Sequence, residues 1–228
     1  MLSVIIIFFL MTTTGLAVCF LLAKRRSNPE KKLSDPSMRI LTEWDLRCMA
    51  FHESGHAVCS CYLPERELLV KITINPSEES FGMISTERRP HHNETETSLR
   101  SRISTLLAGS LAEELFLNTR TTGGIHDFAD ARSIAVDMVT KFGMGRRLGK
   151  VAPVSVYDNS YRLFSEEYRR RADEDAIEII REAELASRNV LVSHSSLVVD
   201  LAELLLEKQT LNKDEIISFF HSKDRSKR

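Results

Sequence analysis

The segment His52-Glu53-Ser54-Gly55-His56 contains the pattern H-E-x-x-H, and it determines how the surrounding chain is interpreted. Residues four positions apart lie on the same face of an α-helix, so both imidazoles can bind one metal ion. Glu53 then lies beside the ion, where its carboxylate can take a proton from water. This arrangement is typical of zinc hydrolases. The alternative is a pair of buried core histidines whose ring nitrogens make ordinary hydrogen bonds.

The residues on either side of this pattern predict a helix over residues 43–62. Thr42 followed by Asp45 is a helix-capping pattern, and Pro64 is a stop signal after the last apolar position. Gly55 lies in the middle of this helix, where glycine costs about 1 kcal/mol of stability relative to alanine. A glycine at this place indicates that another segment approaches the helix backbone closely.

The overall composition is that of an ordinary globular protein, with 43% hydrophobic and 28% charged residues among 228. The formal net charge of -1 does not indicate a nucleic-acid partner. The cysteines, Cys19, Cys48, Cys59 and Cys61, do not form a disulfide pattern, because Cys59 and Cys61 point to different faces of one predicted helix. We interpret them as free thiols in a reducing compartment.

Residues 1–23 are uncharged, predominantly apolar and long enough to span the hydrocarbon core of a membrane. Lys24, Arg25 and Arg26 follow directly, so the positive-inside rule predicts an N-terminus outside and a chain body on the cytoplasmic or a matrix-equivalent side. A cleaved signal peptide is the competing interpretation, but it requires positive charge before the apolar run. We therefore expect a single-pass transmembrane helix at 1–23, followed by a polar linker at 24–40.

After the linker, hydrophobic periodicity and turn residues predict a mostly α-helical domain with a small β-sheet. The predicted strands cover residues 68–74 and 82–86. Further helices are predicted over residues 97–117, 127–142, 165–192 and 195–206, with a last helix that is capped by Asn212 and Glu215 and runs through Phe220. By size these elements form one domain over residues 41–221, and a basic tail covers residues 222–228.

A catalytic zinc ion takes three protein ligands and keeps one position open, so a third ligand is needed. The candidates on or near predicted helices further along the chain are Glu113, Glu114, His126, Asp127 and Asp130. Ordinary alternatives exist: a solvated helix face for the two glutamates, a helix N-cap for Asp127 and a loop position for His126. Spacing alone does not choose among these residues.

Four segments of the chain resemble a known protein family. Ala50–Val58 is similar to the H-E-A-G-H-A segment of the FtsH family, the membrane-bound AAA zinc metalloproteases. The likeness continues through Leu107–Glu114, Thr122–Asp127 and Met138–Gly145, in the family's order and with matching spacing. With the C-terminal helices included, the resemblance covers residues 41–221.

The resemblance implies a mostly helical peptidase domain with Zn²⁺ as its cofactor. In that family an aspartate at the position of Asp127 is the third zinc ligand, and an acidic residue at the position of Glu113 supports a ligand histidine. The implied site therefore has His52, His56 and Asp127 on zinc, Glu53 as the general base and Glu113 behind a ligand histidine. A supporting carboxylate of this kind orients the imidazole and fixes its tautomer.

The resemblance also implies how substrates and partners bind. A family strand near the site pairs with an extended protein or peptide substrate, and here that strand is predicted at residues 68–74, with Val70, Ile72 and Ile74. The family's peptidase domains form sixfold rings. We therefore expect a homo-oligomer, a hexamer by this likeness, or association with an AAA ATPase.

The chain departs from the family in one respect. FtsH proteases carry an AAA ATPase module between anchor and peptidase domain, whereas only residues 24–40 separate the two here. The phosphate-binding pattern G-x-x-x-x-G-K-[ST] does not occur; at Gly149-Lys150, Met144 replaces the first glycine and Val151 follows.

These observations together predict a membrane-anchored zinc metalloendopeptidase that cleaves unfolded or flexible proteins without an ATPase of its own. The first alternative is a non-catalytic or ATPase-partnered subunit of an FtsH-like protease ring. The second is a zinc hydrolase that acts on a different bond, such as an amidase.

Overall fold

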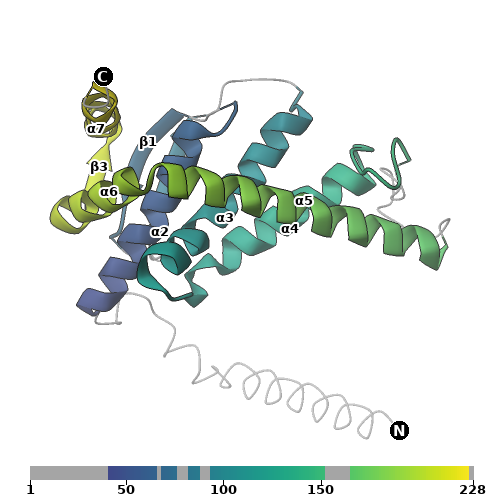
Figure 1. Ribbon diagram of the computed structural model, residues 1–228, viewed down its shortest axis with the longest axis horizontal. Coiled ribbons are helices and arrows are strands. Elements are labelled where there is room, and N and C mark those ends of the chain that lie inside the picture. Colours follow the sequence, from purple (N-terminus) through teal and green to yellow (C-terminus); the bar gives the residue numbers. More distant parts are fainter. Residues whose placement is uncertain (1–40, 66–67, 76–81, 88–92, 152–164, 226–228) are drawn as a thin grey trace, which may run out of the picture. The chain divides into compact units, whose positions relative to one another are not determined.

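The computed structural model describes residues 41–65, 68–75, 82–87, 93–151 and 165–225 (Figure 1). Within it, Ile40–Arg228 form one compact unit. The described elements are α2 (Glu43–Tyr62), β1 (Leu68–Thr73), β2 (Met83–Glu87), α3 (Glu96–Leu117), the 3₁₀ helix η3 (Thr122–Gly124), α4 (Ile125–Thr140), α5 (Glu166–Ser193), α6 (Ser195–Lys208), β3 (Thr210–Asn212) and α7 (Lys213–Arg225). The prediction of a mostly helical domain with a small sheet is confirmed.

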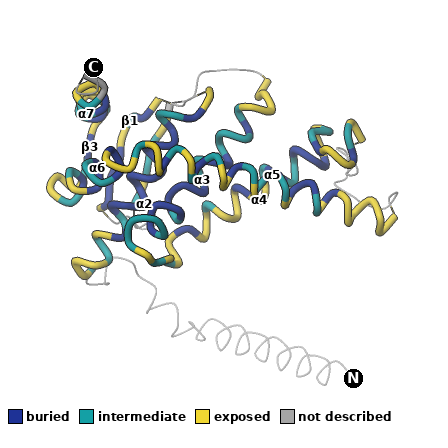
Figure 2. Tube along the Cα trace, in the orientation of Figure 1, coloured by how far each residue is buried: buried dark blue, intermediate teal, exposed yellow. Residues whose placement is uncertain are grey.

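Helix α2 begins and ends where the sequence predicts. Thr42 Oγ1 accepts a hydrogen bond from the backbone N–H of Asp45 (3.2 Å), and Asp45 Oδ2 accepts one from the N–H of Thr42 (2.9 Å). This reciprocal pair satisfies two backbone donors at the start of the helix. Every residue from Ala50 to Ser60 is buried, so α2 is the central helix of the domain (Figure 2).

Helix α3 packs along α2, and the two backbones come close at Gly55. A Cβ atom built on Gly55 would lie 2.5 Å from the carbonyl oxygen of Ala108 and 2.7 Å from the Cβ atom of Ala112. Carbon atoms in contact are ordinarily about 3.5–4.0 Å apart, so a larger residue at position 55 would push the helices apart. The close approach that the mid-helix glycine predicts is therefore present.

The remaining long helices, α5 and α6, pack against the helices that carry the predicted site. Helix α5 packs against α3 and α4, and α6 packs against α2 (Figure 1). The apolar faces of these helices meet in one core that includes Val58 of α2, Ile103 of α3, Met138 of α4 and Leu201 of α6. The H-E-x-x-H segment is thus held by packing on several sides.

The small sheet corrects the predicted substrate strand. Its strand order is β2-β1-β3, with both neighbours antiparallel to β1. Residues 71–73 of β1 are paired on both sides; Ile72, for example, lies opposite Ile84 of β2 and Leu211 of β3. Within the described sheet β1 is therefore the central strand, and its main chain over these residues is not free to pair with a substrate.

The three residues named for that role are placed accordingly. Val70 lies at an irregularity in the pairing with β2, and Ile72 is fully buried in the core. Ile74 follows the end of β1; its side chain is also buried, and its N–H donates to the carbonyl oxygen of Gln209 (2.9 Å). These contacts contradict an open substrate edge at Ile72 and Ile74, whereas the described pairing with β3 does not extend to Val70.

Smaller differences concern element boundaries. Strand β3 was not predicted, because three residues carry no usable periodicity. Helix α4 begins at Ile125, after η3, instead of at Asp127. Helix α7 continues to Arg225, so the basic tail expected from residue 222 begins inside a helix.

The predicted transmembrane helix at 1–23 and the linker at 24–40 lie outside the described residues and remain predictions. Among the helices that the structure describes, none is on its own both long and apolar enough to cross a membrane. Helices α5 and α6 satisfy that test of length and composition only as a pair, with a bend of 80° between them.

One residue of α2 leads to a stability prediction. Ser54 is fully buried, and its hydroxyl oxygen has no hydrogen-bond partner among the described residues. A buried, unsatisfied hydroxyl costs about 1–3 kcal/mol. We expect Ser54→Ala to raise the free energy of unfolding by about 1 kcal/mol, measured by urea denaturation.

The matched control is Ser104→Ala on α3. Ser104 is also buried in a helix, but its hydroxyl donates to the carbonyl oxygen of Arg100 (3.0 Å), so its removal should not stabilise the protein. A Ser54→Ala protein no more stable than the parent would contradict the prediction.

Candidate metal centre

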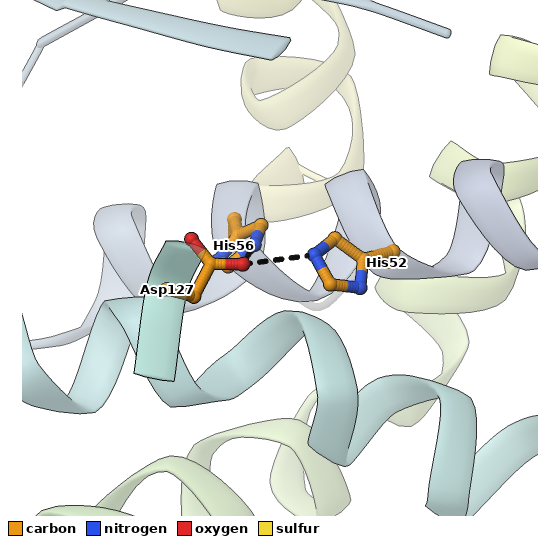
Figure 3. Close-up of side chains that lie close together, drawn as sticks. All are labelled: His52, His56 and Asp127. Carbon is orange, nitrogen blue, oxygen red and sulfur yellow. Dashed lines mark hydrogen bonds and ion pairs between the residues drawn. The ribbon is translucent and has the colours of Figure 1, made fainter. Parts of the chain in front are cut away.

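Three side chains of the predicted site converge on one point (Figure 3). His52 and His56 come from adjacent turns of α2, and Asp127 comes from the first turn of α4. Asp127 Oδ2 lies 3.2 Å from His52 Nε2 and 3.5 Å from His56 Nε2. One ligand atom from each residue lies within 4.8 Å of the other two, a spacing that can hold a metal ion.

The other ring nitrogen of each histidine is held by a hydrogen bond. His52 Nδ1 lies 2.6 Å from Glu113 Oε1, and His56 Nδ1 lies 2.7 Å from the carbonyl oxygen of Thr105. Both partners are acceptors, so each Nδ1 carries the proton and donates it. Nε2 of each ring therefore faces Asp127, and its lone pair would become available to a metal ion once any proton shared with that carboxylate has left.

Glu113 is almost completely buried, with 1% of its surface exposed, and three donors satisfy its carboxylate. Besides His52 Nδ1, the backbone N–H of Thr121 donates to Oε2 (2.7 Å) and the Thr121 hydroxyl donates to Oε1 (3.2 Å). A buried carboxylate without such partners would be strongly destabilising. Thr121 was not predicted from sequence, because a threonine in a loop has no distinctive signal.

The carboxylates make the site attractive to a cation. Burial alone lowers the pKa of His52, but hydrogen bonds with Asp127 and Glu113 outweigh this effect and raise it to about 10. Burial would raise the pKa of Asp127, yet its hydrogen bonds with His52 and His56 hold it well below its usual value. A proton or a metal ion between these groups therefore meets a negative potential.

Gly109 of α3 leaves the space that an ion needs. A Cβ atom built on this glycine would lie 2.5 Å from both His52 Nε2 and His56 Nε2, so any larger residue would collide with the two imidazoles. Zn²⁺ binds imidazole nitrogens and carboxylate oxygens at about 2.0–2.2 Å, and this site offers two of the first and one of the second. The residues present therefore fit a catalytic zinc ion.

Glu53, the remaining residue of the H-E-x-x-H pattern, is buried beside the two histidines. A Cβ atom on Gly82, just before β2, would collide with Glu53 Oε1, so the start of β2 lies against this carboxylate. Burial raises the pKa of Glu53, while the nearby His56 and His52 partly offset the shift. A raised pKa suits a residue that takes up and releases a proton.

The structure distinguishes among the five candidates for the third ligand. Glu114 forms ion pairs with Arg188 (2.9 Å) and Arg120 (2.8 Å), away from the histidine pair. His126 and Asp130 are exposed. Of the five candidates, Asp127 contacts both Nε2 atoms. Glu113 instead accepts a hydrogen bond from Nδ1 of His52, on the opposite side of the ring. The roles of Thr105, which acts through its backbone carbonyl, and of Gly109 were missed, because neither has a reactive side chain.

Comparison with known proteins agrees with this geometry. The family model described as Peptidase family M41 matches residues 39–219. The ATP-dependent zinc metalloprotease FtsH of Thermobaculum terrenum is 34% identical over 186 residues, which cover 78% of this chain and 29% of the relative. The protein of the same name from Thermus thermophilus is 32% identical over 77% of this chain and 29% of the relative.

A third relative, ATP-dependent zinc metalloprotease FtsH 3 of Synechocystis, is 31% identical over 83% of this chain and 32% of the relative. The chain thus spans about a third or less of the length of these curated relatives. The family match, by contrast, extends over most of its 228 residues. The chain belongs to peptidase family M41.

Proposed function

We propose that this chain is a zinc metalloendopeptidase that cleaves unfolded or flexible proteins. The observation that carries the proposal is the convergence of His52, His56 and Asp127, with Glu53 directly beside them. Membership of the M41 family and relatives named as zinc metalloproteases support the same conclusion. Gly109, which keeps the space before the two imidazoles open, supports zinc as the resident ion.

In this proposal His52, His56 and Asp127 hold the ion, while Glu113 and the Thr105 carbonyl fix the imidazole tautomers. When bound, zinc supplies Lewis acidity, which polarises a carbonyl group and lowers the pKa of water. Glu53 accepts the proton of the attacking water and passes it to the leaving amine. Its buried carboxylate, with a raised pKa, is suited to both steps.

We further propose that an extended substrate pairs with the outer edge of β2. This strand is at the edge of the described sheet, and its start lies against Glu53. Pairing through the main chain depends little on side chains but requires an unfolded segment.

The proposed activity is tested with the full 228-residue chain, purified in detergent and loaded with zinc. It should cleave casein, an unfolded protein, and spare a tightly folded one. A chelator should abolish cleavage and added zinc should restore it. Glu53→Gln should keep one bound zinc ion and lower the cleavage rate by about 10²–10⁴-fold, the usual contribution of a general base.

The outcomes separate the alternatives. Zinc binding without any turnover of casein would favour a non-catalytic subunit, and turnover that appears only when an AAA ATPase is added would favour a partnered one. Full activity of Glu53→Gln would exclude the proposed role of this carboxylate.

The position of the metal ion can be tested at Gly109. Gly109→Ala places a methyl group against both Nε2 atoms, so zinc affinity should fall by more than the roughly 10–100-fold typical of losing a supporting residue. Isothermal titration with zinc measures this, and far-UV circular dichroism checks that the apoprotein remains folded. Ser110→Ala, the adjacent position on α3, is the matched control. Unchanged affinity in Gly109→Ala would contradict the proposed position of the ion.

Pairing of an extended substrate with β2 can be tested with modified peptides. In an antiparallel pair only every second residue directs its N–H toward the neighbouring strand. A peptide substrate with single N-methylated amides should therefore show an alternating pattern, in which affected positions lose about 1 kcal/mol, or roughly fivefold in kcat/KM. The unmethylated peptide is the reference. An effect that does not alternate along the peptide would exclude main-chain pairing.

A further inference from the structure

The metal centre is assembled from two parts of the fold that are joined through Glu113. His52 belongs to the central helix α2, whereas Asp127 belongs to α4, which follows the loop after α3. Glu113 contacts both sides, because Oε1 accepts from His52 Nδ1 and both carboxylate oxygens accept from Thr121. Thr121 is the residue directly before η3, and η3 continues into α4.

The hydroxyl group of Thr121 has a defined direction. It accepts a hydrogen bond from the backbone N–H of Gly123 (3.1 Å) and lies 3.2 Å from Glu113 Oε1. Because this hydroxyl has a single proton, it donates that proton to Glu113 Oε1 while its oxygen accepts from Gly123. The chain of donors therefore runs from Gly123 through Thr121 to the carboxylate that also holds His52.

The start of α4 has no side-chain cap of its own. Gly124 occupies the N-cap position and offers no side chain for the first-turn amides. The neighbouring residue in this loop, Arg120, forms an ion pair with Glu114. The side chain of Arg120 is 73% exposed. Exposed ion pairs of this kind contribute little. The part-buried hydrogen bonds of Thr121 therefore hold the start of η3, which leads into the first turn that carries Asp127.

We propose that Thr121 is a positioning residue that couples the placement of Asp127 to the orientation of His52 through Glu113. This inference rests on the proposed zinc site. When the hydroxyl is lost, Glu113 loses one donor and η3 loses its cap. Both ligands can then deviate from the geometry that the ion requires, and metal affinity falls.

The test compares two variants of Thr121 in the 228-residue chain. Thr121→Val keeps the shape and the backbone N–H bond but removes the hydroxyl, whereas Thr121→Ser keeps the hydroxyl. Zinc affinity, measured by competition with a chromophoric chelator, should fall by about 10–100-fold in the valine variant. It should stay within a few fold of wild type in the serine variant and in Arg120→Ala, the exposed control.

Two further readouts separate positioning from a general loss of stability. The visible absorption of the Co²⁺-substituted protein reports ligand geometry and should change in Thr121→Val but not in Thr121→Ser. In a double-mutant cycle, Glu113→Gln and Thr121→Val should lower affinity by less than the product of their separate effects, because both act through one carboxylate.

Equal affinities and spectra for the valine and serine variants, or independent effects in the cycle, would overturn the inference. If Thr121→Val does not fold, Thr121→Ala is compared with Thr121→Ser in the same way. Failure of the wild-type protein to bind zinc in the same titration would instead refute the proposed function itself.

Discussion

The hydrogen bond between His52 Nδ1 and Glu113 is the interaction on which the rest of the structure depends. It crosses the interface between α2 and α3 in the interior, where an ionised carboxylate is tolerated only if its oxygens are fully satisfied. The same bond fixes which nitrogen of His52 faces Asp127. Through its remaining lone pairs, Glu113 also determines where the loop before η3 lies. One buried charge thus relates the central helix, its neighbour and the element that carries Asp127.

Two glycines at the α2–α3 interface have different tasks. Gly55 on α2 lets the carbonyl oxygen of Ala108 approach, which sets the distance between the helices. Gly109 on α3 faces the two imidazoles and leaves the volume before their Nε2 atoms unfilled. Helix packing normally eliminates voids, since each lost contact weakens the core. Glycine at position 109 therefore avoids a clash with the two imidazoles at the place where three ligand atoms meet.

The sequence was sufficient for what is local. Helix α2 was predicted from its cap at Thr42, and the histidine spacing within it from helical periodicity. The third ligand was not decided by spacing, because Asp127 reaches the histidines only through the loop and 3₁₀ turn that follow α3. The predicted substrate edge failed for the same reason: β1 becomes a central strand when β3 pairs with it from far along the chain. The contact between His56 and the carbonyl oxygen of Thr105 could not be predicted either, because every residue type has a backbone carbonyl.

The pairing of β1 with β3 also bears on the order in which the fold can form. Thr73 and Thr210, whose hydroxyls meet at 2.7 Å, are 137 positions apart. Contacts between residues so far apart in the sequence cost chain entropy before their favourable interactions form. Such contacts therefore slow folding. As the chain emerges during synthesis, the helices with the histidines and Asp127 are complete well before the strand that closes the sheet. The sheet of the domain is therefore completed only after Thr210–Asn212 has been synthesised.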